Sequence, residues 1–225
     1  MFAFTQLRQV LESPRMSKLR ARKIKLILFD VDGVLTDGKI WIFPAPGGTE
    51  RPATSSNSTL LERSAQQSGQ SGFGFQSATL IEAKGFHAHD GTAISLARLA
   101  GIKTGLITKR VSETVALRAR DLKIDHVYQG IQNKAAILQQ ILEKDGLNAA
   151  GVAFVGDDVI DLPIMRKCGF AIAVKNARPE VKAEAHYVTV HAGGDGAARD
   201  AVEFILKAQG KWKKAVEDYV EEKGG

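Results

Sequence analysis

Two aspartates that follow a short apolar run, Asp30 and Asp32, are the first residues whose spacing indicates chemistry. Five of the six residues 24–29 are apolar and Gly33 follows the second acid, which is typical of a buried parallel strand that ends in a turn. Ligands bind at the carboxyl ends of strands in open α/β sheets. Because two carboxylates this close repel each other unless a cation or a shared proton relieves them, the sequence predicts a divalent-metal site with Asp30 as a nucleophile.

Other polar side chains stand at or just after the predicted ends of further strands: Thr108 after 102–107, Lys134 after 126–128, and Asp157 and Asp158 after 152–155. Parallel strands end on one edge of a sheet, so we expect these groups to converge. Mg²⁺ prefers a few carboxylate oxygens and keeps waters that a substrate can displace. A hydroxyl and an ammonium suit the oxygens of a phosphoryl group. Each motif alone is explained by a surface turn or a helix cap, but their joint placement predicts metal-dependent phosphoryl chemistry.

The elements that must position these residues alternate between helix and strand after residue 90, which predicts an α/β protein with a three-layer, doubly wound, Rossmann-like parallel sheet. The clearest of them are strands at 24–30, 102–107, 126–128, 152–155, 169–174 and 187–190, and helices at 111–122 and 197–208. We expect one domain, residues 24–210, to contain them all.

A β-hairpin is predicted over residues 39–83, directly after the first motif. Its two arms, 39–43 and 78–83, are rich in strand formers. Between them, residues 44–76 are rich in Ser, Gln and Gly and offer little to bury, so we expect a disordered insertion at the hairpin tip.

The two ends of the chain are expected to lie outside the domain. Residues 1–23 form a basic, amphipathic leader whose helical pattern ends at Pro14, and the basic cluster 15–25 is predicted to be a solvated arm. Residues 211–225 carry an apolar stripe at helical spacing. They are predicted to form an amphipathic helix on this or a neighbouring subunit, with a frayed tail as the alternative.

Bulk composition limits the class of protein. A chain of 225 residues, 44% hydrophobic and 25% charged, suits one ordered domain. Its one cysteine, Cys168, excludes an intrachain disulfide and fits the cytoplasm. We find no secretion signal and no apolar run near the roughly 20 residues that cross a bilayer. The net charge is +6, but the sequence contains no nucleic-acid-binding motif. We therefore expect the protein to bind a small anionic substrate and to bind neither nucleic acid nor membranes.

Together these motifs resemble the haloacid dehalogenase superfamily, and more closely the 3-deoxy-D-manno-octulosonate 8-phosphate phosphatases. The resemblance is carried by residues 30–38, 89–91, 128–134, 155–163 and 192–197. It implies a fold without a large cap and a homotetramer. In that family the hairpin flap helps to build the subunit interface and shields the active site of a neighbour.

The resemblance also implies roles for the residues at the strand ends. Asp30 attacks phosphorus, and Asp32 is the general acid and base. Thr108 and Lys134 hold phosphoryl oxygens. Mg²⁺ is the cofactor, bound by Asp30, the backbone carbonyl of Asp32, and Asp157. Two further acids, Asp158 and Asp161, orient the waters of the metal or brace the loop.

Contacts to a sugar-acid substrate are implied for Arg110, Arg118 and the segment 87–91, which includes His87, His89, Asp90 and Gly91; Asp32 and Lys134 also contact the substrate. The chain departs from the family at Lys109, where a glycine is usual, and at the two histidines. We expect the two histidines to lie on one face of a strand and to have a role in substrate binding or at an interface, with a second metal site as the alternative.

The implied activity is Mg²⁺-dependent hydrolysis of 3-deoxy-D-manno-octulosonate 8-phosphate through an aspartyl-phosphate, in the synthesis of lipopolysaccharide precursors. Two alternatives stay open: a phosphatase for a related nine-carbon sugar acid 9-phosphate of the neuraminate type, and a non-catalytic assembly module that keeps the fold.

Overall fold

The computed structural model describes residues 14–44 and 80–224. A parallel sheet of six strands lies at its centre: β1 (Leu26–Phe29), β4 (Lys103–Ile107), β5 (His126–Tyr128), β6 (Val152–Gly156), β7 (Phe170–Ala173) and β8 (Tyr187–Val188). Their spatial order is β5-β4-β1-β6-β7-β8, and all the pairings are parallel. The predicted parallel sheet is therefore confirmed.

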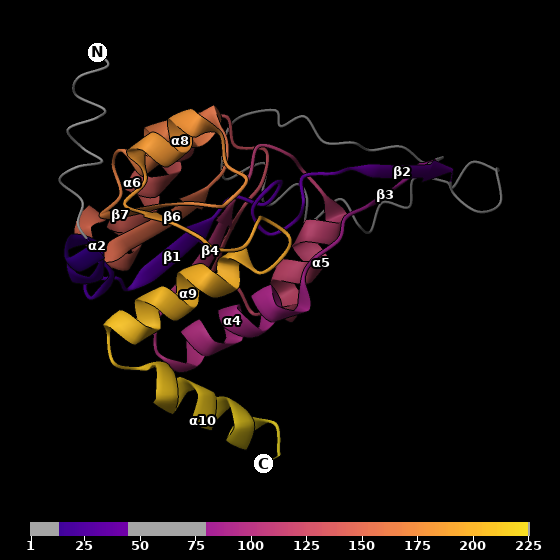
Figure 1. The fold of residues 1–225 in the computed structure, drawn as a ribbon. Helices are drawn as coiled ribbons and strands as arrows, with labels where there is room; N and C mark the ends of the chain where they lie inside the picture. The colour runs from indigo at the N-terminus through magenta and orange to yellow at the C-terminus, as the bar shows by residue number, and fades with distance from the viewer. Residues whose placement is uncertain (1–13, 45–79, 225) are drawn as a thin grey trace.

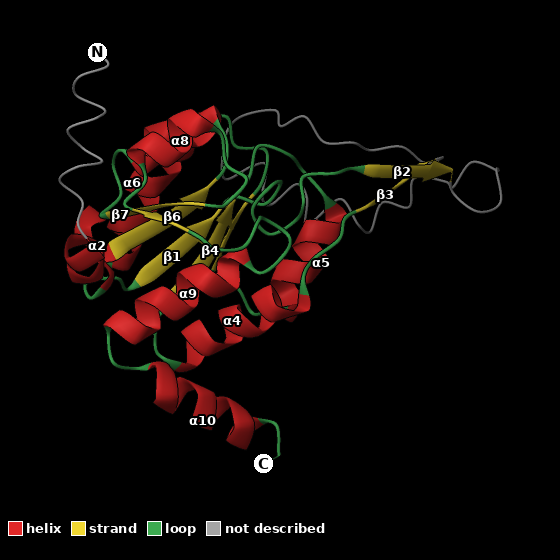
Figure 2. Cartoon of the chain, in the orientation of Figure 1, coloured by secondary structure: helices red, strands yellow, loops and turns green. Residues whose placement is uncertain are grey.

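Helices cover both faces of this sheet. The helices of the described residues are α2 (Pro14–Ala21), α4 (Ala88–Leu99), α5 (Glu113–Asp121), α6 (Lys134–Asp145), α7 (Leu162–Met165), α8 (Pro179–Glu184), α9 (Ala197–Ala208) and, outside α4 and α9, α10 (Trp212–Glu222). Short 3₁₀ turns occur at η1 (Ala149–Gly151) and η2 (Val159–Asp161). Helices α4 and α9 lie on one face and α6 and α8 on the other (Figures 1 and 2). This arrangement is the expected three-layer α/β architecture.

The sequence of strand β1 is an unbroken apolar run because helices cover both faces of the sheet there. All four of its residues are buried. The neighbouring strand β6 is buried along its whole length as well. Helix α9 packs a continuous apolar face against the core, formed by Ala197, Ala198, Ala201, Val202, Ile205 and Leu206.

The chain reverses its direction of winding at β1. Strand β1 pairs with β4 on one side and with β6, more than 120 residues later, on the other. Loops that leave neighbouring strands on either side of such a switch point diverge and leave a crevice between them. The Asp30 motif begins directly after β1, at this point in the sheet.

The predicted hairpin is present. Strands β2 (Trp41–Pro44) and β3 (Leu80–Ala83) pair antiparallel, and the hairpin projects away from the sheet and its helices (Figure 1). Its apolar side chains are exposed, including 55% of Trp41 and 49% of Phe43. Of the predicted insertion 44–76, Pro44 ends β2 and the rest lies outside the described residues.

The basic cluster is not a free arm, which corrects the sequence-based prediction. Its basic side chains are mostly exposed, as expected, but the backbone forms helix α2, which begins at Pro14. The backbone N–H groups in the first turn of a helix have no acceptor within the helix. Proline, which lacks this N–H, therefore costs no hydrogen bond there. Ala21 is fully buried and Ser17 donates a hydrogen bond of 2.6 Å to the His186 carbonyl, so α2 is docked on the domain. The rest of the leader, 1–13, lies outside the described residues.

The placement of His87 and His89 on a strand is wrong. Helix α4 begins at Ala88, with His87 at its N-cap and His89 in its first turn. The apolar periodicity that predicts this helix starts only near Ile94, because its first turn carries polar and small residues. The two imidazole rings pack edge to face, with their centroids 4.8 Å apart.

The predicted tail helix is present as α10, which packs on α4 and α9 of the same chain. Ala215 is 1% exposed, and Arg98 donates to both carboxylate oxygens of Glu222 at 3.0 and 2.9 Å. Within 14–44 and 80–224, every helix is too short or too polar to span a bilayer. The division into leader, domain and tail remains a prediction.

Candidate active site

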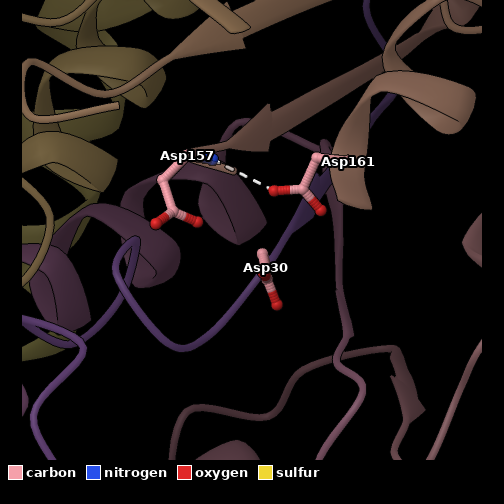
Figure 3. Close-up of side chains that lie close together, drawn as sticks. All are labelled: Asp30, Asp157 and Asp161. Carbon is pink, nitrogen blue, oxygen red and sulfur yellow. Dashed lines mark hydrogen bonds between the residues drawn. The ribbon is translucent and has the colours of Figure 1, made fainter. Parts of the chain in front are cut away.

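Three carboxylates meet at the carboxyl edge of the sheet. Asp30 follows β1, Asp157 follows β6, and Asp161 ends η2. One oxygen of each lies within 4.8 Å of the others. Figure 3 shows the three side chains gathered around one point, with the backbone N–H of Asp157 donating to Asp161 at 3.0 Å. Residues more than 120 positions apart therefore share one site, as the sequence predicts for Asp30 and Asp157.

One ammonium group compensates part of this negative charge. Lys134, the first residue of α6, lies 2.8 Å from Asp30 and 2.7 Å from Asp161, and its side chain is 2% exposed. Asn133 caps the helix by accepting a hydrogen bond from the Ala136 N–H, which fixes where α6 begins. The sequence predicts that Lys134 reaches this site, and it does.

Burial and mutual repulsion disfavour the charged forms of two of these acids. Burial raises the pKa of Asp30 to about 6, an effect that Lys134 opposes and Asp161 increases. Burial, followed by the charges of Asp30 and Asp161, raises the pKa of Asp157 to about 7. For Lys134, burial alone would lower the pKa, but the two adjacent carboxylates outweigh it and raise it. The site therefore favours an additional positive charge.

The residues present fit a divalent cation. Three carboxylates against one ammonium leave two negative charges uncompensated. The Oδ1 atom of Asp157 is buried without a hydrogen-bond partner among the described residues. Carboxylate oxygens are the ligands that Mg²⁺ prefers. Gly33 also matters, because a Cβ atom there would collide with the Asp157 carboxylate.

Asp161 braces the loop, one of the two roles expected for it. Its Oδ1 accepts from Lys134, and its Oδ2 accepts from the backbone N–H of Asp157. Asp158 forms a capping box with Asp161 at the start of η2, and its side chain accepts from the Val159 N–H at 2.7 Å. Both acids therefore shape the loop that presents Asp157.

A cavity of about 440 Å³ opens beside these residues, and its lining consists of Asp30, Asp32, Thr108, Lys109, Arg110, Asp157, Asp158 and Ile160. Thr108 is buried at the end of β4, and its hydroxyl accepts from the Arg110 N–H at 3.3 Å. The predicted residues Asp32, Thr108 and Arg110 thus share one cavity with the nucleophile candidate Asp30.

The other predicted substrate residues lie apart from that cavity in this chain. Asp90 is buried and accepts hydrogen bonds from Gly196 and Arg199 at the start of α9. Arg118 lies against Gly91, where a Cβ atom would collide with its guanidinium. His87, Asp90, Gly91 and Arg118 share a second, smaller pocket. Their role in substrate binding stays a prediction, as does that of His89.

Two residues at the root of the hairpin are part of the site although the sequence did not single them out. Lys84 pairs with Asp32, and Glu82 accepts hydrogen bonds from Ser112 at 2.8 Å and from Arg110 at 3.4 Å. They follow a long polar insertion and carry no motif of their own. Only the folding back of β3 onto the loop after β4 brings them here.

The fold and the site together define a haloacid dehalogenase-like hydrolase. Aspartates follow neighbouring parallel strands, and a lysine from the first turn of α6 completes the set. A family model of that description, haloacid dehalogenase-like hydrolase, matches residues 100–199.

Comparison with known proteins narrows this class. The 3-deoxy-D-manno-octulosonate 8-phosphate phosphatase of Escherichia coli (strain K12) is 36% identical over 196 residues, which are 87% of this chain and 86% of that protein. The chain therefore belongs to the 3-deoxy-D-manno-octulosonate 8-phosphate phosphatase family.

Solved structures agree with this membership. The phosphatase of this name from Moraxella catarrhalis, in complex with a magnesium ion, a phosphate ion and a 3-deoxy-D-manno-octulosonate molecule, matches with a TM-score of 0.74 and 30% identity over 92% of this chain and 99% of that one. The cobalt-bound deoxy-D-mannose-octulosonate 8-phosphate phosphatase from Haemophilus influenzae matches with a TM-score of 0.66 and 29% identity over 85% and 92% of the two chains.

Proposed function

We propose that this protein is a Mg²⁺-dependent phosphatase that converts 3-deoxy-D-manno-octulosonate 8-phosphate to 3-deoxy-D-manno-octulosonate and phosphate in the cytoplasm, as a step toward lipopolysaccharide. The observation that carries the proposal is the contact of Asp30 with Lys134 beside Asp157, in a chain 36% identical to phosphatases of that name.

The chemistry follows from the groups around Asp30. Its Oδ1 accepts from the Val31 N–H at 2.7 Å and its Oδ2 lies 2.8 Å from the Lys134 ammonium, so the carboxylate is held at the cavity wall. An Asp30 oxygen forms a bond to phosphorus as the bond to the sugar oxygen breaks, which gives an aspartyl-phosphate. Lys134 and the Thr108 hydroxyl hold phosphoryl oxygens.

Asp32 moves the proton in both halves of the reaction. It donates a proton to the departing sugar oxygen and then takes one from the water that attacks the aspartyl-phosphate, which releases phosphate and restores Asp30. Asp30, Asp157 and the Asp32 carbonyl would hold a divalent cation, which would supply positive charge beside the phosphoryl oxygens. The sugar acid extends toward Arg110, which lines the cavity.

Replacement of Asp30 by Asn tests this proposal. The amide lacks the nucleophilic oxygen anion, so we expect turnover of any phosphomonoester to fall by at least about 10³-fold. The measurement is phosphate release with and without Mg²⁺. If Asp30→Asn retains turnover, the assignment of Asp30 as the nucleophile is wrong. If the unaltered protein hydrolyses no phosphomonoester, the result favours a non-catalytic module.

The choice of substrate needs a separate measurement. We expect kcat/KM to be highest for the eight-carbon sugar acid phosphate in a panel that includes the nine-carbon 9-phosphate and simple sugar phosphates. A clear preference for the nine-carbon compound would replace the proposed substrate and leave the mechanism as it is.

A further inference from the structure

Lys84 places a buried positive charge behind Asp32. Its side chain is 0% exposed, and its ammonium contacts the Oδ1 atom of Asp32. Among the described residues, its ammonium also lies 3.6 Å from the Glu82 carboxylate. An ammonium loses much hydration energy on burial and is tolerated only where carboxylates compensate it.

Two carboxylates and two cationic side chains form a closed ring of contacts at this point. The Oε2 atom of Glu82 accepts from Arg110 at 3.4 Å, and the Nε atom of Arg110 lies 3.9 Å from Oδ2 of Asp32. The ring thus runs from Asp32 through Lys84, Glu82 and Arg110 back to Asp32. It connects the loop after β1, the root of the hairpin and the loop after β4.

The two faces of the Asp32 carboxylate differ. Asp32 lines the cavity and its side chain is 21% exposed, whereas Lys84 does not line the cavity. The ammonium therefore approaches Oδ1 from the protein side. The other oxygen, Oδ2, lies toward Arg110, which is also a cavity residue.

We propose that Lys84 is a positioning residue for Asp32: it holds Oδ1 and leaves Oδ2 as the oxygen that exchanges the proton with the leaving group and with water. This inference rests on the proposed function, in which Asp32 is the general acid and base. The proton passes from Oδ2 to the sugar oxygen as the phosphorus–oxygen bond breaks, and it returns to Oδ2 from the attacking water.

Anchoring the hairpin does not by itself require this ammonium. Glu82 already accepts a hydrogen bond of 2.8 Å from the Ser112 hydroxyl, and its backbone carbonyl accepts from Thr114 at 3.4 Å. These neutral donors fasten β3 to the start of α5. A buried ion pair is a costly way to add one more attachment, since apolar residues of similar volume often serve stability equally well.

The test compares two phosphomonoesters that differ in their need for a proton. An alkyl phosphate must receive one on its leaving oxygen, whereas p-nitrophenolate leaves as a stable anion. For Lys84→Met we expect release of the alkyl alcohol to slow by about 100-fold, while the pre-steady-state burst of p-nitrophenolate changes by less than about 5-fold. Lys84→Arg, which keeps the charge, should recover most of the alkyl rate. Equal losses on both substrates, or no loss, would overturn the proposal.

A double-mutant cycle separates positioning from a general structural effect. In an Asp32→Asn background, Lys84→Met should change the alkyl rate by less than about 3-fold, because Lys84 acts only through Asp32. Independent, multiplicative losses would argue against the inference. If Lys84→Met does not fold, Lys84→Gln, which keeps a hydrogen-bond donor, takes its place in both measurements.

Lys103→Met is the matched control. Lys103 also pairs with an aspartate, Asp145, at 3.1 Å, but at the start of β4 rather than its end. Both substrates should be hydrolysed by this variant at the unaltered rate. If the protein is not a phosphatase at all, the result is different: neither the unaltered protein nor Lys103→Met would release phosphate from either ester in the presence of Mg²⁺.

Discussion

Asp157 and Asp161 carry the same side chain four residues apart, yet their surroundings give them different roles. Both oxygens of Asp161 accept hydrogen bonds, from Lys134 and from the backbone of the loop. The Oδ1 atom of Asp157 has no partner among the described residues, and burial raises the pKa of this carboxyl to about 7. Asp161 therefore holds the loop in place, and Asp157 keeps an oxygen atom that no described residue occupies, as the proposed cation site requires.

Cys168 allows a prediction of pH dependence at the scale of one residue. Burial raises the pKa of its thiol from 9.0 to about 12. Below pH 9 the thiol is protonated in both folded and unfolded states. Above it, only the unfolded state ionises, so the free energy of unfolding should fall as pH rises from 9 toward 12, by about 1 kcal/mol at pH 10.

Comparison with Cys168→Ala isolates this effect from the titration of lysines. The difference in the free energy of unfolding between the two proteins, measured in urea at pH 8 and pH 10, should shift by that amount. A difference independent of pH would refute the prediction. The folded thiol should also resist alkylation at pH 8, because it is 7% exposed and protonated.

At the scale of elements, helix α9 begins without a side-chain cap of its own. Its N-cap is Gly196, which has a positive φ of 102°. The missing acceptor comes from α4, since Asp90 accepts from the backbone N–H groups of Gly196 and Arg199 at 3.3 and 2.8 Å. A carboxylate at a helix N-terminus also interacts favourably with the helix dipole. Asp90 thereby fixes α4 against α9.

Asp90→Ala should therefore lower stability whether or not Asp90 contacts substrate. Two N–H groups near the buried start of α9 lose their acceptor, and we expect a loss of about 1–2 kcal/mol and a Tm lower by a few degrees. Thermal unfolding followed by circular dichroism measures it. Asp195→Ala, in the exposed loop just before α9, is the control and should leave Tm unchanged. Equal Tm values for the two variants would exclude the capping role.

At the scale of the whole molecule, a separate group of basic residues lies at the opposite edge of the sheet from the aspartate cluster. A cleft of about 1050 Å³ is lined by five basic residues, Arg22, Lys23, Lys25, Lys207 and Lys211, at the edge of the sheet where its strands begin. Helices α2, α6 and α9 end there. Arg22 donates to the Ala208 carbonyl at 3.2 Å and Lys211 to the Ala100 carbonyl at 3.0 Å, so these cations compensate helix C-termini.

The exposed hairpin offers an apolar surface for the tetramer that family membership implies. Trp41, Ile42 and Phe43 leave an apolar surface on an arm that projects from the domain (Figure 1). We expect a homotetramer in which this surface is covered. The double variant Trp41→Ser, Phe43→Ser should form smaller species in native mass spectrometry. Val190→Ser, which removes an apolar side chain that is 64% exposed on the domain itself, is the control. A double variant that stays tetrameric would contradict the expected interface.

Periodicity and strand-end chemistry were enough to predict most of the fold and the centre of the site. Strands β1 and β6 are buried apolar runs followed at once by acids, so the sequence alone places Asp30 and Asp157 on one edge of the sheet. Helix α9 matches its predicted bounds because its apolar residues recur at helical spacing. Such local signals are strong wherever an element is long and half or fully buried.

Tertiary structure alone decided the contacts that depend on loops and on folding back. No apolar periodicity marks the first turn of α4, so the sequence predicted a strand for the histidines there. The docking of α2 on the domain depends on contacts with residues far along the chain, such as the one between Ser17 and His186. Lys84 meets Asp32 only because β3, which follows a long insertion in the sequence, folds back and pairs with β2. Local patterns determine which elements form, whereas a pairing across 52 residues depends on how those elements pack.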